Sequence, residues 1–340
     1  MTSTSNSIRL AIVGIHNQGI DHLEAIRDTD GIELTALCDT NRQLLEKVAS
    51  DYSLRDIYLD EDLSHTAERS DVDALVIALP HHLHPMAVDL AVKEGKHLLK
   101  EKPLARTLSE AHVLARKVRE AGLVMHTGVQ RRHHSTYQRL GTALDGHRIK
   151  SASLEMTIAV PPRAERVDEP PTWRDDYRRS GGGVLIDLGY HGIDLMHYLV
   201  GPLEVLSCIT LRGDIPCPPQ VIEDDSRVWA VAGPSWVHMR FGRAAEKREH
   251  IVIDTDQGRF VANRESLHYQ PAEGEQKLLH QSKRSWEDTM KEQFTTFRRA
   301  IEAGEVGTND LPAQIPTMRF IENCYSQRVD QGFAALEGEI

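Results

Sequence analysis

Short apolar runs alternate with amphipathic stretches over residues 1–127 of the chain. The apolar runs lack the strict alternation of a strand that has one face in water, so they predict strands buried on both faces. Segments with helical periodicity lie between them, which predicts crossover helices and therefore a parallel sheet. We predict an α/β fold with a doubly wound parallel sheet. Its strands are expected at residues 9–14, 32–39, 73–80, 96–101 and 122–128.

The pattern changes after residue 127. Strand-like segments joined by short turns dominate from about residue 203 to residue 269, which predicts an open, largely antiparallel sheet. We therefore predict two domains, residues 1–127 and residues 128–340, and allow the C-terminal helix of the second α/β domain to pack back on the first. Further elements are expected as helices at residues 131–144, 184–201, 286–304 and 312–332, and as a strand at residues 150–160.

The composition argues against several classes of protein. The 340 residues are 40% hydrophobic and 27% charged, as in ordinary soluble globular proteins, and the first residues do not resemble a secretory signal. A formal net charge of −11 argues against nucleic acid or an anionic membrane as the partner. The four cysteines are scattered, which is typical of a reducing cytoplasm and does not favour a zinc site. We expect a cytoplasmic protein without a metal centre.

The sequence GIHNQG, at residues 14–19, joins the first predicted strand to the first predicted helix. A dinucleotide-binding turn has the pattern G-x-G-x-x-G; Gly14 and Gly19 match its first and third glycines, and His16 replaces the second. A tight turn without a ligand is the alternative, but a helix N-terminus at this place can hold a phosphate. We expect a dinucleotide site with an altered loop, in which His16 either crowds the pyrophosphate or donates a hydrogen bond to it.

Asp39 ends the second predicted strand, twenty residues after Gly19. An acidic side chain there can accept both hydroxyl groups of the adenosine ribose and repels a 2′-phosphate, which favours NAD over NADP. The alternative is that Asp39 caps the following helix, and the two roles do not exclude each other.

Lys102 lies just past the end of the fifth predicted strand, where open α/β sheets bind ligands. It precedes a proline and is not on a helix face, so it is either positioned for function or an ordinary surface lysine. Farther along, Asp187 and His191 are spaced i and i+4 in a predicted helix and would share one face. Such polar groups on an apolar face are costly unless they are paired or useful, so a buried and satisfied pair is the alternative.

Three histidines, His81, His82 and His84, follow the fourth predicted strand. We expect them to line a cofactor pocket or its entrance. A metal site is the alternative, but no carboxylate or cysteine spacing supports it.

Two motifs carry a family resemblance: EKPLA at residues 101–105 and GGGVLIDLGYHGIDL at residues 181–195. Together they resemble the Gfo/Idh/MocA family, the glucose–fructose oxidoreductase and inositol dehydrogenase type. Matches elsewhere, including GVQRRHHSTY at residues 128–137 and WRDD at residues 173–176, extend the resemblance over nearly the whole chain. The departures are His16 and the histidine-rich RRHH.

The resemblance implies an N-terminal Rossmann domain, a C-terminal α/β domain with an open sheet, and hydride transfer with NAD(H) or NADP(H). It places the family's catalytic lysine, aspartate and histidine on Lys102, Asp187 and His191. For substrate binding we expect Arg131, Arg132, Trp173 and Tyr190. For cofactor binding we expect Gly14, His16, Asn17, Gln18, Gly19, Asp39, Pro80, His81, His84, Glu101 and Lys102.

The sequence thus predicts an NAD-dependent oxidoreductase acting on a sugar, a cyclitol or a related polyhydroxylated small molecule, with NADP less favoured. Two alternatives remain open: a redox-assisted lyase or glycosidase with tightly bound NAD, and a non-catalytic cofactor-binding protein. We also expect a homodimer or homotetramer formed through the exposed face of the second sheet.

Overall fold

A computed structural model describes residues 7–161, 165, 170–213, 215–244, 246–283, 285–304 and 310–327. The chain divides into two compact units. The first comprises residues 1–133 and 284–315, and the second comprises residues 134–283 and 316–340. Residues 284–315, which the sequence assigned to the second domain, therefore belong to the first unit.

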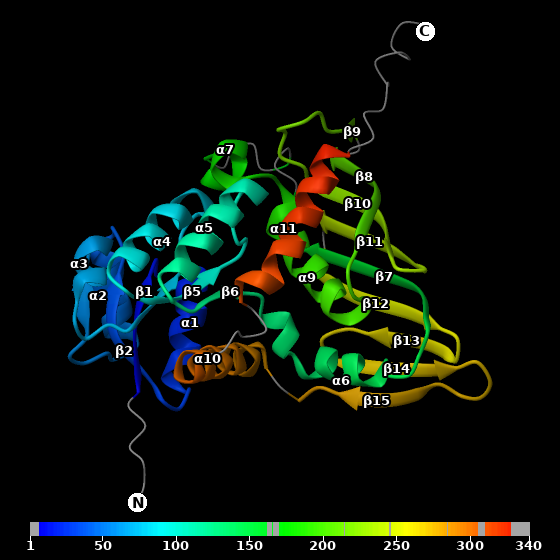
Figure 1. Cartoon of the computed structure of the whole chain (residues 1–340), viewed down its shortest axis with the longest axis horizontal. Helices are drawn as coiled ribbons and strands as arrows, with labels where there is room; N and C mark the ends of the chain where they lie inside the picture. The colour runs from blue at the N-terminus through cyan, green and yellow to red at the C-terminus, as the bar shows by residue number, and fades with distance from the viewer. Residues whose placement is uncertain are drawn as a thin grey trace, which may run out of the picture. The chain divides into compact units, whose positions relative to one another are not determined.

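The first unit contains a parallel sheet of six strands in the order β3-β2-β1-β4-β5-β6. Figure 1 labels β1, β2, β5 and β6 of this sheet. Every residue of β4 and β6 is buried, as expected for strands with both faces covered. The order reverses between β1 and β4, which is where open α/β sheets bind ligands beyond the carboxyl ends of their strands. The strands are β1 (Ile8–Val13), β2 (Ile32–Cys38), β3 (Tyr58–Asp60), β4 (Ala74–Ile77), β5 (His97–Glu101) and β6 (Met125–Gly128).

Helices cover both faces of this sheet. Right-handed crossovers place the helices after β1 and β2 on one face and those after β3, β4 and β5 on the other. Phe294 and Phe297 of α10 complete the core beside α1, and α4 lies next to α5 (Figure 1). The helices are α1 (Asn17–Arg27), α2 (Arg42–Asp51), α3 (Leu63–Glu68), α4 (His84–Lys93), α5 (Leu108–Glu120) and α10 (Trp286–Ala303), with the 3₁₀ turns η1 (His81–Leu83) and η2 (Gln130–His133).

The second unit contains a sheet of nine strands in the order β15-β14-β13-β12-β7-β11-β10-β8-β9 (Figure 1). All neighbouring strands are antiparallel except β7 and β11. The strands are β7 (Ile149–Ile158), β8 (Glu204–Arg212), β9 (Ile215–Pro216), β10 (Asp225–Ala232), β11 (Ser235–Arg243), β12 (Arg248–Thr255), β13 (Gly258–Ala262), β14 (Ser266–Pro271) and β15 (Lys277–Gln281).

Helices α6, α8 and α9 contact the strands of this second sheet. Helix α9 approaches closely because Gly192 has no side chain: a Cβ atom there would lie 2.5 Å from the ring of Phe241. The helices are α6 (Ser135–Ala143), α7 (Tyr177–Ser180), α8 (Val184–Asp187), α9 (Gly189–Val200) and α11 (Leu311–Ser326), with the 3₁₀ turn η4 (Trp173–Asp175); α11 begins in the first unit and ends in the second.

The predicted fold class is confirmed in both of its parts. Two helix predictions need correction. The segment expected as one helix at residues 131–144 is divided into η2 and α6, and that at residues 184–201 is divided into α8 and α9. None of the helices in the described part of the chain is long and apolar enough to cross a membrane.

Candidate functional site

The turn between β1 and α1 requires both of its glycines. Gly14 has φ +85°, and a Cβ atom there would lie 2.6 Å from the carbonyl oxygen of Ala78 at the end of β4. A Cβ atom on Gly19 would lie 2.0 Å from the carbonyl oxygen of Gly14. Only glycine fits either position, so the turn brings the backbone of α1 directly against the switch point of the sheet.

The first turn of α1 is open and carries no acidic residue. His16 occupies the N-cap position with its side chain exposed, and that side chain makes no capping hydrogen bond. Asn17 and Gln18 are exposed as well, and the Gln18 amide donates to Asp21 at 2.9 Å. The N–H groups of this helix end therefore suit an anionic group such as a pyrophosphate.

Asp39 links the end of β2 to the glycine turn. One carboxylate oxygen accepts from the backbone N–H of Ile15 and the other from that of Asn41, both at 3.0 Å. The residue that caps α2 is Asn41, whose side chain accepts from the N–H of Leu44 at 3.1 Å, so the alternative role of Asp39 as this cap is wrong. Each oxygen of Asp39 retains a lone pair with which it could accept a ribose hydroxyl.

Beyond β4, the half-buried Pro80 precedes η1, and His81 is buried with its ring centroid 5.7 Å from that of His84. His84 is fully buried, with Nε2 2.9 Å from the carbonyl oxygen of Leu79 and Nδ1 3.1 Å from Nζ of Lys100. Burial lowers the pKa of His84 well below its usual value, and the charges of Lys100 and His81 lower it further. The ring is therefore neutral and belongs to an interior network.

Glu101 ends β5 as a buried carboxylate. It accepts from Nε2 of His22 at 2.9 Å, from the Gln130 amide at 3.3 Å and from the backbone N–H of Lys102 at 3.3 Å. Burial alone would raise its pKa, but the hydrogen bond and charge of His22, with the charges of Lys102 and Lys100, outweigh burial and lower it. The sequence prediction included Glu101 and missed His22, because nothing local marks a histidine on a helix as the partner of a carboxylate 79 residues away.

Lys102 follows β5 directly and is half-buried, and its peptide bond to Pro103 is cis. It lies at the carboxyl end of the parallel sheet, as expected for a ligand-binding position. In the same unit, Arg131 is buried with its guanidinium carbon 5.7 Å from the ring centroid of Trp286, and Arg132 is half-buried.

In the second unit, Asp187 ends α8 and His191 lies in the first turn of α9. The helix is interrupted at Leu188, so the two residues are not on one continuous helix as the sequence predicted. Both side chains are half-buried, and a carboxylate oxygen of Asp187 lies 3.4 Å from Nε of Arg174. The Arg174 guanidinium carbon is 4.3 Å from the ring centroid of Trp173.

Glu223 holds the segment that leads into α8, and the sequence prediction missed it. Its buried carboxylate accepts from the N–H groups of Gly183 and Leu185, each at 3.0 Å, and from the hydroxyl of Tyr325 at 2.8 Å. It therefore satisfies the first N–H groups of the helix that carries Asp187. Tyr190, expected to bind substrate, is fully buried.

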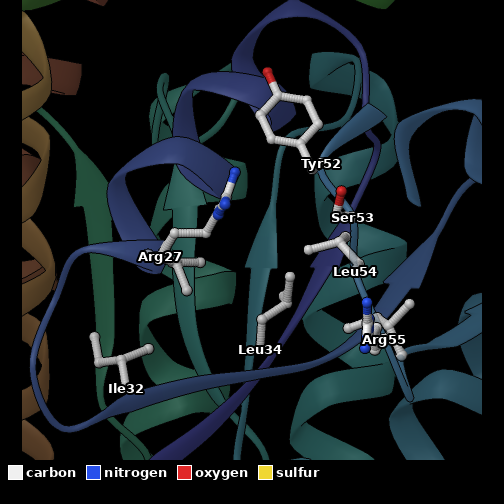
Figure 2. A pocket seen from close by; sticks show the side chains of 9 residues that line it. Arg27, Ile32, Leu34, Tyr52, Ser53, Leu54 and Arg55 are labelled. Atoms are coloured by element: carbon white, nitrogen blue, oxygen red, sulfur yellow. The ribbon is translucent and has the colours of Figure 1, made fainter. Parts of the chain in front are cut away.

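A separate pocket of about 300 Å³ lies on the first unit and contains none of the predicted site residues (Figure 2). Apolar side chains of β2, including Ile32 and Leu34, form part of its wall, and Arg27 and Arg55 lie beside them. Ile32 begins β2, so the pocket lies toward the amino end of that strand. Ligands of parallel sheets bind at the carboxyl ends instead, and the pocket is not the expected cofactor site.

Two family descriptions match most of the described chain. Residues 8–129 match "Oxidoreductase family, NAD-binding Rossmann fold", and residues 148–260 match "GFO/IDH/MocA C-terminal domain".

Curated relatives match at low identity. A myo-inositol 2-dehydrogenase of Thermotoga maritima is 26% identical over 195 residues, which cover 57% of this chain and 55% of the relative. A dTDP-3,4-didehydro-2,6-dideoxy-alpha-D-glucose 3-reductase of Streptomyces violaceoruber is 28% identical over 218 residues, covering 63% of this chain and 60% of the relative. The chain therefore matches less than two thirds of the length of these relatives.

Solved structures share the whole fold. An oxidoreductase from Agrobacterium radiobacter, in complex with NAD+, L-tartaric acid and magnesium, has a TM-score of 0.81 at 15% identity and covers 95% of this chain and 97% of its own. A 3-ketoreductase from Actinomadura kijaniata, in complex with TDP-benzene and NADP, has a TM-score of 0.79 at 21% identity and covers 95% and 98%.

Proposed function

Because this chain belongs to the GFO/IDH/MocA oxidoreductase family, we propose that it transfers a hydride between a nicotinamide dinucleotide and a hydroxyl-bearing carbon of a sugar, a cyclitol or a related polyhydroxylated small molecule. The observation that carries the proposal is the turn at Gly14 and Gly19, where added side chains would collide with backbone carbonyls and where α1 opens without an acidic residue. The named inositol dehydrogenase and dTDP-sugar reductase among the relatives support a sugar-like substrate.

NAD is the cofactor that fits this turn better than NADP. The carboxylate of Asp39, fixed by the N–H groups of Ile15 and Asn41, stands at the end of β2 next to the glycine turn. Its free lone pairs accept ribose hydroxyls, and its negative charge opposes a 2′-phosphate. The cofactor, when bound, supplies the nicotinamide carbon that accepts or returns the hydride.

The chain's own residues provide proton transfer and orientation. In alcohol oxidation, neutral His191 accepts the hydroxyl proton while the C–H bond releases its hydride. Asp187 orients the imidazole and stabilises its cation, and Lys102 holds the substrate oxygen. In reduction, His191 returns the proton to the new hydroxyl. Arg131, Arg132, Trp173 and Tyr190 are proposed to shape the substrate site.

A homodimer or homotetramer formed through the second sheet is also part of the proposal. Trp229 of β10 and Trp236 of β11 are exposed and project from the same face, because Val231 pairs with Trp236 and lies two residues from Trp229. Exposed tryptophans on one sheet face are typical of a protein interface. Trp236→Glu should lower the sedimentation coefficient to that of a monomer; a variant that sediments like the parent protein would contradict this interface.

The decisive experiment is a panel of sugars, cyclitols and sugar acids with NAD and with NADP, read by nicotinamide absorbance. With the identified substrate, His191→Ala and Lys102→Ala should each reduce turnover by roughly a hundredfold or more, the scale of a lost general acid–base group, while NAD still binds. His197→Gln, a change in the same helix, is the matched control and should retain turnover. Folded, NAD-bound forms of both alanine variants with parental turnover would refute the assignment. Tightly held NAD with substrate cleavage and no absorbance change would instead indicate a redox-assisted lyase.

A further inference from the structure

Lys100 is a fully buried lysine in a strand of the first unit. Its Nζ lies 2.7 Å from the carbonyl oxygen of Glu101, 2.6 Å from that of Pro103 and 3.1 Å from Nδ1 of His84. The two carbonyl groups belong to the residues on either side of Lys102. A single ammonium group thus ties together both ends of the short segment that carries the proposed catalytic lysine.

The protonation states of this network follow from its geometry. Nε2 of His84 lies 2.9 Å from the carbonyl oxygen of Leu79, which can only accept, so Nε2 carries the proton and Nδ1 accepts. An ammonium group has three N–H donors, and Lys100 has three acceptors: two carbonyl oxygens and one imidazole nitrogen. Protonated Lys100 therefore satisfies every bond in the network, and neutral His84 is required for it.

We propose that Lys100 is a positioning residue: together with His84 it clamps the backbone on both sides of Lys102, and the clamp loosens when Lys100 loses its proton. This inference rests on the proposed function, because it assigns Lys100 a role through Lys102. It concerns the loop and not the substrate, since no atom of Lys100 is exposed.

Loss of one proton breaks the balance of donors and acceptors. A neutral amine has two N–H groups for three acceptors, and Nδ1 of His84 can donate only if Nε2 gives up its bond to Leu79. One of the bonds must therefore be lost.

The change falls within a physiological range of pH. Burial lowers the pKa of Lys100 to about 7; the charges of Glu101 and Glu110 raise it, and that of Lys102 lowers it further. His84 stays neutral throughout, because burial, Lys100 and His81 all lower its pKa.

The clamp predicts a pH dependence separate from that of the catalytic histidine. Above about pH 7, turnover should fall with an apparent pKa that belongs to Lys100. Misplacement of a reacting group by about 1 Å can cost roughly a hundredfold in rate, so the deprotonated form should be slower by roughly 10- to 100-fold.

Lys100→Met tests this role, because methionine fills a similar volume without donors or charge. Lys96→Met is the matched control: Nζ of Lys96 also donates to two backbone carbonyls, of Arg69 and Val72, each at 2.8 Å, but at the other end of β5. Lys100→Met should turn over slowly at pH 6 and should lack the decline above pH 7. Lys96→Met should keep the parental profile even if it is less stable.

Hydrogen exchange measured by mass spectrometry provides a readout that does not depend on activity. In the parent protein, a peptide spanning residues 98–108 should exchange faster above pH 7 than intrinsic chemistry accounts for; in Lys100→Met it should exchange fast at both pH values. If the parent shows no excess exchange, or if Lys100→Met keeps the parental turnover profile, the clamp is refuted. If the parent oxidises and reduces nothing in the panel, the proposed function fails while exchange still decides the clamp. Should Lys100→Met not fold, the parent's exchange at the two pH values decides alone.

Discussion

Acid should destabilise the first unit through one histidine of its sheet. His126 lies in β6, is fully buried, and has its ring centroid 5.4 Å from that of Phe297. Neither ring nitrogen has a hydrogen-bond partner among the described residues. Burial, and then the charge of His133, lower the pKa of His126 from 6.5 to about 4. The native structure therefore holds a neutral imidazole that becomes protonated more readily when the chain unfolds.

The magnitude follows from the two pKa values. A depressed pKa in the folded state means that the stability is fully present above pH 6.5 and is lost as the pH falls toward 4. Between pH 8 and pH 5, protonation of this histidine should lower the free energy of unfolding by about 2 kcal/mol. Well below pH 4 the total decrease should reach about 3 kcal/mol. The pKa of His133 is also lowered to about 4, so the parent protein should lose more than this single contribution.

His126→Leu isolates the contribution. Urea unfolding of the parent and the variant at pH 8 and pH 5, followed by pulsed hydrogen exchange of the peptide that contains β6, reports the free energy of unfolding of this unit. Between pH 8 and pH 5, the free energy of unfolding should decrease by about 2 kcal/mol less in the variant than in the parent. His112→Gln, on the exposed surface of α5, is the control, and its free energy of unfolding should decrease by as much as that of the parent. Equal losses in the parent and in His126→Leu would refute the reasoning, because protonation of His126 would then cost the folded state nothing.

Three further predictions concern the glycine turn with its neighbour Asp39 and the segment that leads into α8. Asp39→Ser should narrow the preference for NAD over NADP and weaken NAD binding through the lost bond to Ile15, as measured by kinetics with both cofactors; a parent protein that prefers NADP would contradict it. His16→Gly should tighten NAD binding in calorimetric titration without slowing turnover, if the exposed ring only crowds the pyrophosphate, and a clear loss of affinity would show that the ring binds phosphate. Glu223→Gln should lower the free energy of unfolding by about 1–3 kcal/mol, because the amide N–H₂ would face N–H groups at the start of α8. Thermal or urea unfolding measures this change, and an unchanged stability would contradict the prediction.

The main features of the fold could be predicted because they depend on local pattern. Strands that are buried on both faces appear in the sequence as continuous apolar runs. The turn at Gly14 and Gly19 appears as two glycines with a fixed spacing. The short strand β3, only three residues long, carries no such run, and β14 and β15 are largely polar. These strands form because neighbours in the sheet offer unpaired backbone groups, which the local sequence does not encode.

The partners of the polar residues could not be predicted, because they come from distant parts of the chain. Asp39 was correctly located at a strand end, but its bond to Ile15 spans 24 residues, and that of Glu223 to Gly183 spans 40. The position of His84 after β4 could be predicted from the sequence, but its environment could not. Whether an imidazole faces a pocket or an interior network depends on which groups the fold brings to its two nitrogens.

One member of these buried polar networks, Lys100, could have been recognised from the hydrophobic pattern of the sequence. In the segment KHLLKEKP, the residue singled out from the sequence is Lys102, which follows the strand and precedes a proline. Lys100 is the greater anomaly, because it lies within a strand that is expected to be buried on both faces, and a buried ammonium group is costly unless its donors are satisfied. A lysine inside such a strand therefore implies acceptors fixed nearby, and the carboxyl end of a parallel sheet, where chains turn and expose carbonyl groups, is the natural source of them. The same logic applies to any ionisable residue within an apolar strand: its position predicts that a network exists, and the structure then identifies the members, here His84 and the carbonyl groups of Glu101 and Pro103.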